Sequence, residues 1–162
     1  MTIASLDAPL LGGCLCGRVR YRIVEDPIAF YLCHCTDCQC ETGSAFALSM
    51  ILRRSALEHE RGELRSIVVT LPDGARQRPA TLCAHCLVRL WGDSPGVPQI
   101  LGLSPGTLDD PKAYEPYGNI WTRSARPPVL LARGPCFERQ PEDPIAMVKI
   151  WQEHRRAMGE SR

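Results

Sequence analysis

The chain has 162 residues, enough for one domain and short for two. Its 19 Lys and Arg residues nearly balance 18 Asp and Glu residues, giving a formal net charge of +1 without a basic run or an acidic tail. This composition argues against nucleic acid or a membrane as a partner, and no apolar run approaches the roughly 20 residues of a membrane-spanning helix. Residues 1–11 lack the cationic start of a signal peptide. We therefore expect one cytoplasmic domain over residues 1–162, whose oligomeric state the composition does not fix.

Most of the predicted elements are β-strands. In residues 18–24, arginines alternate with Val19, Tyr21 and Ile23, which is typical of a half-buried strand. Further strands are predicted over residues 29–33, 45–52, 64–71, 76–82, 88–91 and 99–103. Pro79 restricts its strand to a sheet edge or a bulge. We predict a turn at 53–56 and loops within the Pro- and Gly-rich stretch 94–116.

One helix is predicted, at the C-terminal end over about residues 142–158. Ile145, Val148, Trp151 and Met158 recur near helical spacing, and Pro144 suits a first turn. We expect this helix to cover one side of the β core without carrying chemistry. The fold class is therefore mainly β with a C-terminal helix.

Seven of the nine cysteines form three tight clusters. The clusters are Cys14 with Cys16, then Cys33 with Cys35 and Cys38, then Cys83 with Cys86. Thiolates two or three residues apart can converge on one tetrahedral ion, and Zn²⁺ is the usual occupant, about 2.3 Å from sulfur. Two other interpretations are weaker. An odd cysteine count without an export signal disfavours a disulfide framework, and the spacing differs from that of the ferredoxin runs that hold iron–sulfur clusters.

Two of the clusters complement each other. Cys14 and Cys16 precede the first clear strand, and Cys83 and Cys86 lie between two later ones. Joined, the two pairs make a closed four-thiolate zinc site, which is structural because it has no open position. Either pair alone is also compatible with a buried or redox-active dithiol.

The remaining cluster supplies three thiolates from one short segment. Zinc bound by Cys33, Cys35 and Cys38 keeps a fourth position for water or a substrate thiol, the arrangement that catalytic zinc needs. Three other residues are candidates to close this shell, namely Cys40, His34 and His85. If one of them binds, the catalytic interpretation fails. Cys136 is predicted to be a lone thiol.

These cysteines lie in motifs that resemble a known family. The motifs are Gly-Cys-Leu-Cys-Gly at 13–17, Cys-His-Cys-Thr-Asp-Cys at 33–38 with Thr-Gly-Ser-Ala-Phe at 42–46, and Cys-Ala-His-Cys at 83–86. They resemble the glutathione-dependent formaldehyde-activating enzyme family, which includes centromere protein V. Residues 119–124 and 135–139 are similar to its tail segments, so the resemblance covers about residues 11–140.

The resemblance implies a zinc-bound β-tent fold of small stacked antiparallel sheets with two zinc ions. It assigns Cys14, Cys16, Cys83 and Cys86 to the structural ion, and Cys33, Cys35 and Cys38 to the catalytic one. Three positions depart from the family's pattern: Leu87 replaces a glycine that permits a left-handed turn, Asn119 replaces a histidine, and Cys40 replaces a basic or polar residue. None of these changes removes a ligand.

The activity that the resemblance implies is that of a carbon–sulfur lyase, in which the glutathione thiol adds to formaldehyde and gives S-hydroxymethylglutathione. Arg53, Arg54 and Arg123 are candidates to bind the two carboxylates of glutathione. The alternative is a non-catalytic binding or scaffold domain, in which both zinc ions only hold loops. An open coordination position distinguishes the enzyme from the scaffold.

Overall fold

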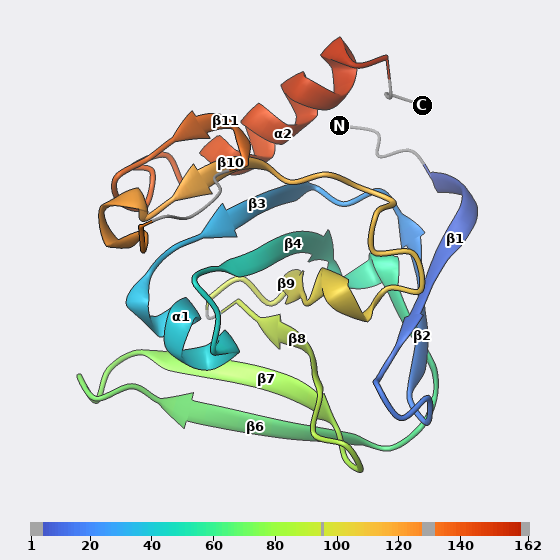
Figure 1. Ribbon diagram of the computed structural model, residues 1–162. Helices are drawn as coiled ribbons and strands as arrows, with labels where there is room; N and C mark the ends of the chain where they lie inside the picture. Colours follow the sequence, from blue (N-terminus) through green and yellow to red (C-terminus); the bar gives the residue numbers. More distant parts are fainter. Residues whose placement is uncertain (1–4, 95, 128–131, 160–162) are drawn as a thin grey trace. The chain divides into compact units, whose positions relative to one another are not determined.

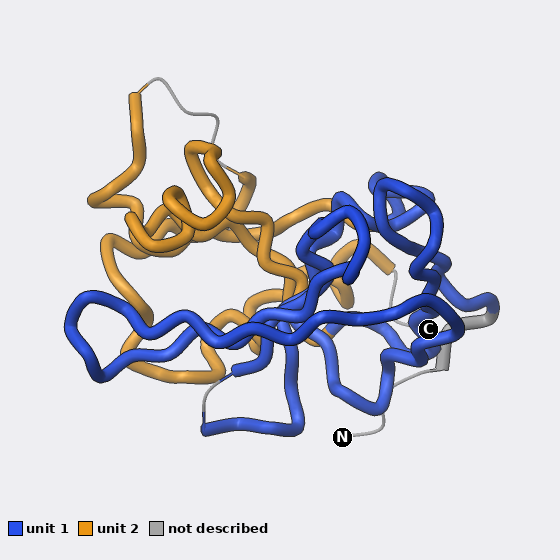
Figure 2. Tube along the Cα trace, turned by 90° about the horizontal axis from the view of Figure 1, so that it is seen from below, with its two compact units in different colours: residues 1–27, 51–113 blue, residues 28–50, 114–162 orange. Residues whose placement is uncertain are grey.

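The computed structural model describes residues 5–94, 96–127 and 132–159. Its contacts divide the chain into two compact units, which Figure 2 colours separately. Unit 1 comprises Met1–Pro27 and Ile51–Ala113, and unit 2 comprises Ile28–Met50 and Tyr114–Arg162. Strands dominate both units, which confirms the mainly β class, and a helix lies near the C-terminus as expected.

Unit 1 contains two antiparallel arrangements of strands. Its elements are β1 (Ser5–Gly13), β2 (Arg20–Glu25), η1 (Arg54–Ala56), β5 (Leu57–Arg61), β6 (Leu64–Thr70), β7 (Gln77–Cys83), β8 (Arg89–Asp93), β9 (Ile100–Leu103) and η2 (Pro105–Thr107). One sheet has the order β1-β2-β5, and the other strands follow the order β9-β8-β7-β6 (Figure 1). Strands β1 and β5 were not among the predicted elements.

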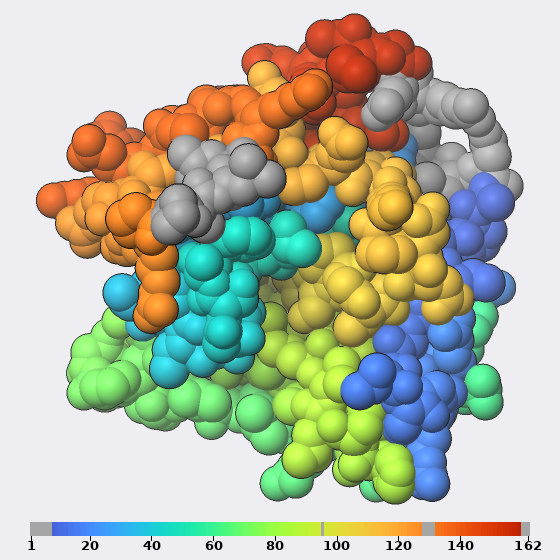
Figure 3. All heavy atoms as spheres, in the orientation of Figure 1, coloured from blue at the N-terminus to red at the C-terminus, as the bar shows by residue number. Residues whose placement is uncertain are grey.

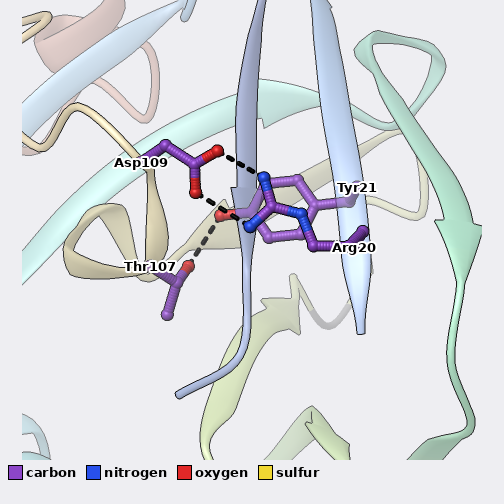
Figure 4. Close-up of polar contacts among 4 residues, drawn as sticks. All are labelled: Arg20, Tyr21, Thr107 and Asp109. Atoms are coloured by element: carbon purple, nitrogen blue, oxygen red, sulfur yellow. Dashed lines mark hydrogen bonds and ion pairs between the residues drawn. The ribbon is translucent and has the colours of Figure 1, made fainter. Parts of the chain in front are cut away.

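Strand β2 has the predicted alternation. Val19, Tyr21 and Ile23 are fully buried, whereas the arginines between them reach the surface. The hydroxyl of Tyr21 lies 2.7 Å from Oγ1 of Thr107, and Arg20 donates to the carboxylate of Asp109 (Figure 4). These contacts fix the start of β2, and therefore the loop that precedes it, to residues 107–109.

The position of Pro79 corrects part of the prediction for its strand. Strand β7 lies between β6 and β8 and is not an edge. Pro79 pairs with Val68 of β6, whereas the pairing with β8 involves Thr81 and Leu82 and has a register shift between them. The missing amide hydrogen of Pro79 is therefore tolerated beside an irregular part of the ladder.

Unit 2 contains strands and both helices. Its elements are β3 (Ala29–Cys33), α1 (Thr36–Thr42), β4 (Ala47–Arg53, which ends in unit 1), β10 (Tyr117–Ile120), η3 (Thr122–Ser124), β11 (Arg133–Cys136) and α2 (Ala146–Ala157). The strand order is β11-β10-β3-β4, and β10 runs parallel to both β11 and β3. Helix α1 and strands β10 and β11 were not predicted.

Helix α2 covers β3 and β10 as expected, but with a different apolar face (Figure 1). Met147 and Trp151 are its buried residues, and the Trp151 ring meets the Phe30 ring edge-on at 6.0 Å between centroids. Ile145 and Met158 lie just outside the helix ends and are 52% and 61% exposed, so their predicted place in the face is wrong. In the part of the chain that the structure describes, no helix has the length and apolarity needed to cross a membrane.

Candidate metal centres

The first candidate centre, in unit 1, is a group of four sulfur atoms. The Sγ atoms of Cys14, Cys16, Cys83 and Cys86 all lie within 4.8 Å of one another. Cys14 and Cys16 are 3.4 Å apart, and Cys16 and Cys83 are 3.9 Å apart. A tetrahedral ion with bonds of about 2.3 Å spaces its sulfur ligands by ~3.8 Å. The group can therefore hold a metal ion of this size in a closed shell.

Two similar loops supply these four sulfurs. The Cys14 amide donates to the Val19 carbonyl at 3.2 Å, and the Cys83 amide donates to the Val88 carbonyl at 3.0 Å. Backbone amides also donate to sulfur: Val19 to Cys14 at 3.3 Å, and His85 and Cys86 to Cys83 at 3.4 and 3.5 Å. Amide hydrogens pointed at sulfur stabilise thiolates, which are the metal-binding form of cysteine.

The pKa values of these cysteines reflect four thiols crowded into a small space. Burial raises the pKa of Cys14, but hydrogen bonds from the Val19 amide and from the three other cysteines outweigh this effect and lower it to about 6. The Arg18 amide lowers the pKa of Cys16, whereas burial and the other three cysteines raise it to about 11. Four thiolates at these distances repel one another, and a divalent cation removes that repulsion.

Leu87 adopts the left-handed turn that glycine usually makes. Its φ is +59°, and its amide donates to the Cys83 carbonyl at 3.0 Å. In the other loop Gly17 has a φ of +72° and donates to the Cys14 carbonyl at 3.0 Å. Leu87 therefore makes the same turn as Gly17, at the cost of backbone strain because it carries a side chain.

The second candidate centre, in unit 2, has three sulfur atoms. The Sγ atoms of Cys33, Cys35 and Cys38 lie within 4.8 Å of one another. Cys33 ends strand β3, Cys35 is the N-cap of helix α1, and Cys38 lies within that helix. The Cys35 sulfur accepts a hydrogen bond from the Cys38 amide at 3.4 Å, in the place of the oxygen that usually caps a helix. The sharp change from strand to helix brings the three sulfurs together.

The same crowding affects the buried Cys33. Its neighbours Cys35 and Cys38, followed by burial, raise the pKa of the Cys33 thiol well above its usual range. Burial also raises the pKa of Tyr31, and the charges of the three cysteines add to that shift. The three sulfurs are close enough to share one ion, so this group can also hold a metal ion, and a cation would favour the thiolate form of all three cysteines.

The three candidates for a fourth ligand at the second centre lie outside its group of sulfurs. Among the described residues, the group contains neither Cys40, nor His34, nor His85. Cys40 is exposed on α1. His34 is fully buried, and its Nε2 lies 3.3 Å from Oδ1 of Asn119. His85 is exposed in unit 1.

The candidate arginines have different surroundings. Arg54 belongs to unit 1, where it donates to the Pro98 carbonyl at 2.9 Å and forms an ion pair with Asp93. Arg53 is exposed in the same unit. Arg123 lies in unit 2 with its guanidinium 5.0 Å from the centre of the Trp121 ring. Only Arg123 of these three therefore shares a unit with the three-cysteine group.

A fourth arginine, Arg126, was not a candidate. It donates from Nε to Oε1 of Gln39 at 3.0 Å, and Gln39 immediately follows Cys38 in helix α1. The two residues are 87 positions apart, so no local pattern signals the contact.

A cavity of about 240 Å³ adjoins the four-sulfur group. Its lining residues are Arg18, Gly62, Glu63, Cys83, Ala84 and His85. Because four sulfurs complete a tetrahedral shell, a ligand in this cavity would meet no open coordination position.

Three comparisons relate the chain to known proteins. No curated protein matches the chain in sequence. A crystal structure of a Rhodobacter sphaeroides protein is similar, with 18% sequence identity, a TM-score of 0.48 and coverage of 62% of this chain and 89% of that one. The family model of the glutathione-dependent formaldehyde-activating enzyme matches residues 9–124, which hold all seven clustered cysteines but not residues 135–139. The chain belongs to the glutathione-dependent formaldehyde-activating enzyme family.

Proposed function

We propose that this protein is a zinc-dependent carbon–sulfur lyase that joins a small thiol, glutathione, to formaldehyde. Family membership supports a role of this kind. The observation that carries the proposal is the group of three sulfurs, Cys33, Cys35 and Cys38, from which Cys40 and His34 are excluded. We further infer that the protein works in the cytoplasm and has the β-tent arrangement of its family.

In this proposal the two cysteine groups have different roles. Cys14, Cys16, Cys83 and Cys86 hold a structural zinc ion that ties two loops together. Cys33, Cys35 and Cys38 hold a second ion and leave one position for a ligand. When bound, such an ion would supply Lewis acidity, which lowers the pKa of a thiol or polarises an aldehyde oxygen.

The reaction balances without a further reactant. The thiol sulfur forms a bond to the carbonyl carbon, the C=O π bond breaks, and the thiol proton ends on the oxygen, giving an S-hydroxymethyl adduct. The chain's contribution is to hold the reacting groups together. The Cys38 amide keeps the Cys35 sulfur in place, and the buried His34 fixes the strand end between Cys33 and Cys35 through its bond to Asn119.

A rate measurement tests this function. The zinc-loaded protein should raise the rate of glutathione addition to formaldehyde above the uncatalysed rate, as measured by exchange NMR at equilibrium. Cys38→Ser should abolish the increase, and Cys40→Ser, whose side chain is exposed outside the group, should retain it. An unmodified protein that leaves the rate unchanged would support the non-catalytic scaffold instead.

A further inference from the structure

Gln39 links the three-cysteine loop, residues 33–38, to the segment after β10, residues 121–127. The residue is only 8% exposed, and its side-chain amide has hydrogen bonds at both its nitrogen and its oxygen. Nε2 donates to the carbonyl of His34 at 2.7 Å and to that of Ser124 at 2.8 Å. These two carbonyls fix the amide orientation, because they accept only from nitrogen. The amide oxygen must therefore face Arg126.

Only the Nε atom of the Arg126 guanidinium is used in the hydrogen bond to Gln39. Its Nε donates to Oε1 of Gln39 at 3.0 Å, which leaves the two terminal nitrogens as a fork that matches a carboxylate. Several arginines of this protein already have carboxylate partners, such as Arg20 with Asp109 and Arg54 with Asp93. Arg126 has no carboxylate partner among the described residues.

Arg123 adds a second positive charge to the same segment. It lies on η3 with its guanidinium over the Trp121 ring, and it forms no ion pair within the described part of the chain. The segment lies beside α1, and in Figure 3 both are at the surface, α1 in cyan and the segment in orange. Within the described part of the chain, two arginines without carboxylate partners thus lie next to the loop that carries the three cysteine sulfurs.

The separation between Arg126 and the three-cysteine loop suits a peptide-like thiol. Gln39 directly follows Cys38, and its own amide donates to the Cys35 carbonyl at 3.0 Å, so one side chain separates Arg126 from the cysteine loop. In a cysteinyl peptide, a carboxylate one residue beyond the cysteine lies up to ~7 Å from the sulfur. A thiol bound at the three-cysteine group can therefore extend a carboxylate toward Arg126.

We propose that Arg126, anchored by Gln39 and assisted by Arg123, is the carboxylate subsite of the three-cysteine centre. This inference rests on the proposed function and specifies its substrate class. The preferred thiol is an anionic, peptide-like one such as glutathione, and a neutral thiol of the same shape binds less well. Gln39 is a positioning residue, because it acts only through Arg126.

Calorimetric binding of glutathione and of its diethyl ester to the zinc-loaded full chain tests the subsite. The ester keeps the thiol and removes both carboxylates. We expect the unmodified protein to bind glutathione about tenfold more tightly than the ester, as a charge-assisted pair near solvent would give. Arg126→Gln should weaken glutathione binding by about the same factor and leave ester binding unchanged. Arg65→Gln, an exposed arginine on β6, is the matched control and should behave like the unmodified protein.

Failure of the subsite and failure of the proposed function give different results. If Arg126→Gln retains the preference for glutathione, or if the unmodified protein binds both ligands equally, the subsite is wrong and the proposed function stands. If the unmodified protein binds neither ligand, the proposed function is wrong and the subsite with it. Circular dichroism and zinc content of Arg126→Gln establish that the variant is folded and loaded.

Discussion

Asn119 fixes the tautomer of His34. The Asn119 amide is oriented by the backbone of Ala132, which donates to Oδ1 at 3.1 Å and accepts from Nδ2 at 2.9 Å. Oδ1 therefore faces Nε2 of His34, and because this oxygen only accepts, Nε2 carries the proton. Nδ1 of His34 is buried and has no hydrogen-bond partner in the described structure. Asn119 thus orients the residue that lies between two of the clustered cysteines.

Replacing Asn119 should destabilise the fold. Asn119→Leu leaves Nε2 of His34 and both backbone groups of Ala132 without partners, and we expect the free energy of unfolding to fall by about 2–4 kcal/mol. Chemical denaturation of the metal-loaded protein measures this. Gln140→Leu, at an exposed position, is the control and should change the value by less than about 0.5 kcal/mol. Equal effects in the two variants, or a ¹⁵N spectrum with the proton on Nδ1, would contradict the assignment.

Leu87→Gly should stabilise the protein. The left-handed conformation at φ +59° costs a non-glycine residue about 1 kcal/mol, and the side chain is 53% exposed, so little burial is lost. We expect the melting temperature to rise by ~2 °C. Leu15, 87% exposed in the other loop, lies outside the left-handed region, so Leu15→Gly should lower it. A decrease in both variants would show that Leu87 is not strained.

Tyr21 should make stability depend on alkaline pH. Burial raises the pKa of its phenol to about 12, so the folded state favours the protonated form. The stability that it contributes is complete below the unfolded pKa of about 10 and is lost as the pH rises to 12. Between pH 9 and 12, Tyr21→Phe should lose about 2 kcal/mol less than the unmodified protein.

The matched control for Tyr21 is Thr107→Val. This variant removes the hydroxyl partner of Tyr21 but keeps the buried phenol, so its loss of stability at high pH should remain. Denaturation series at several pH values distinguish the two variants. If Tyr21→Phe and the unmodified protein lose stability in parallel, the phenol does not titrate as described.

Local patterns in the sequence predicted part of this structure. The alternation of Val19, Tyr21 and Ile23 identified β2, because strand periodicity is a property of neighbouring residues. Helix α1 was missed because it has seven residues and is capped by a cysteine sulfur in place of a usual capping oxygen. The apolar face of α2 was misplaced because Ile145 and Met158 fit the helical period but lie beyond the helix ends.

The candidate site residues also divide into those that local sequence patterns predicted and those that only the folded chain brings together. Cysteine spacing was enough to identify the three clusters, because each is local in sequence. Joining Cys14 and Cys16 to the pair at 83 and 86, across 67 positions, relied on two pairs of thiolates completing one tetrahedral shell. The contact of Gln39 with Arg126 joins distant positions through a single hydrogen bond, and only the folded chain brings them together. The prediction of one domain over residues 1–162, and the roles assigned to the cysteines, stay predictions.

Native mass spectrometry of zinc content tests the central claim most directly. The unmodified protein should carry about two zinc ions per chain, Cys38→Ser about one, and the exposed-site control Cys40→Ser about two. Two ions retained by Cys38→Ser, or one lost by Cys40→Ser, would contradict an ion held by Cys33, Cys35 and Cys38 with a position left for a thiol.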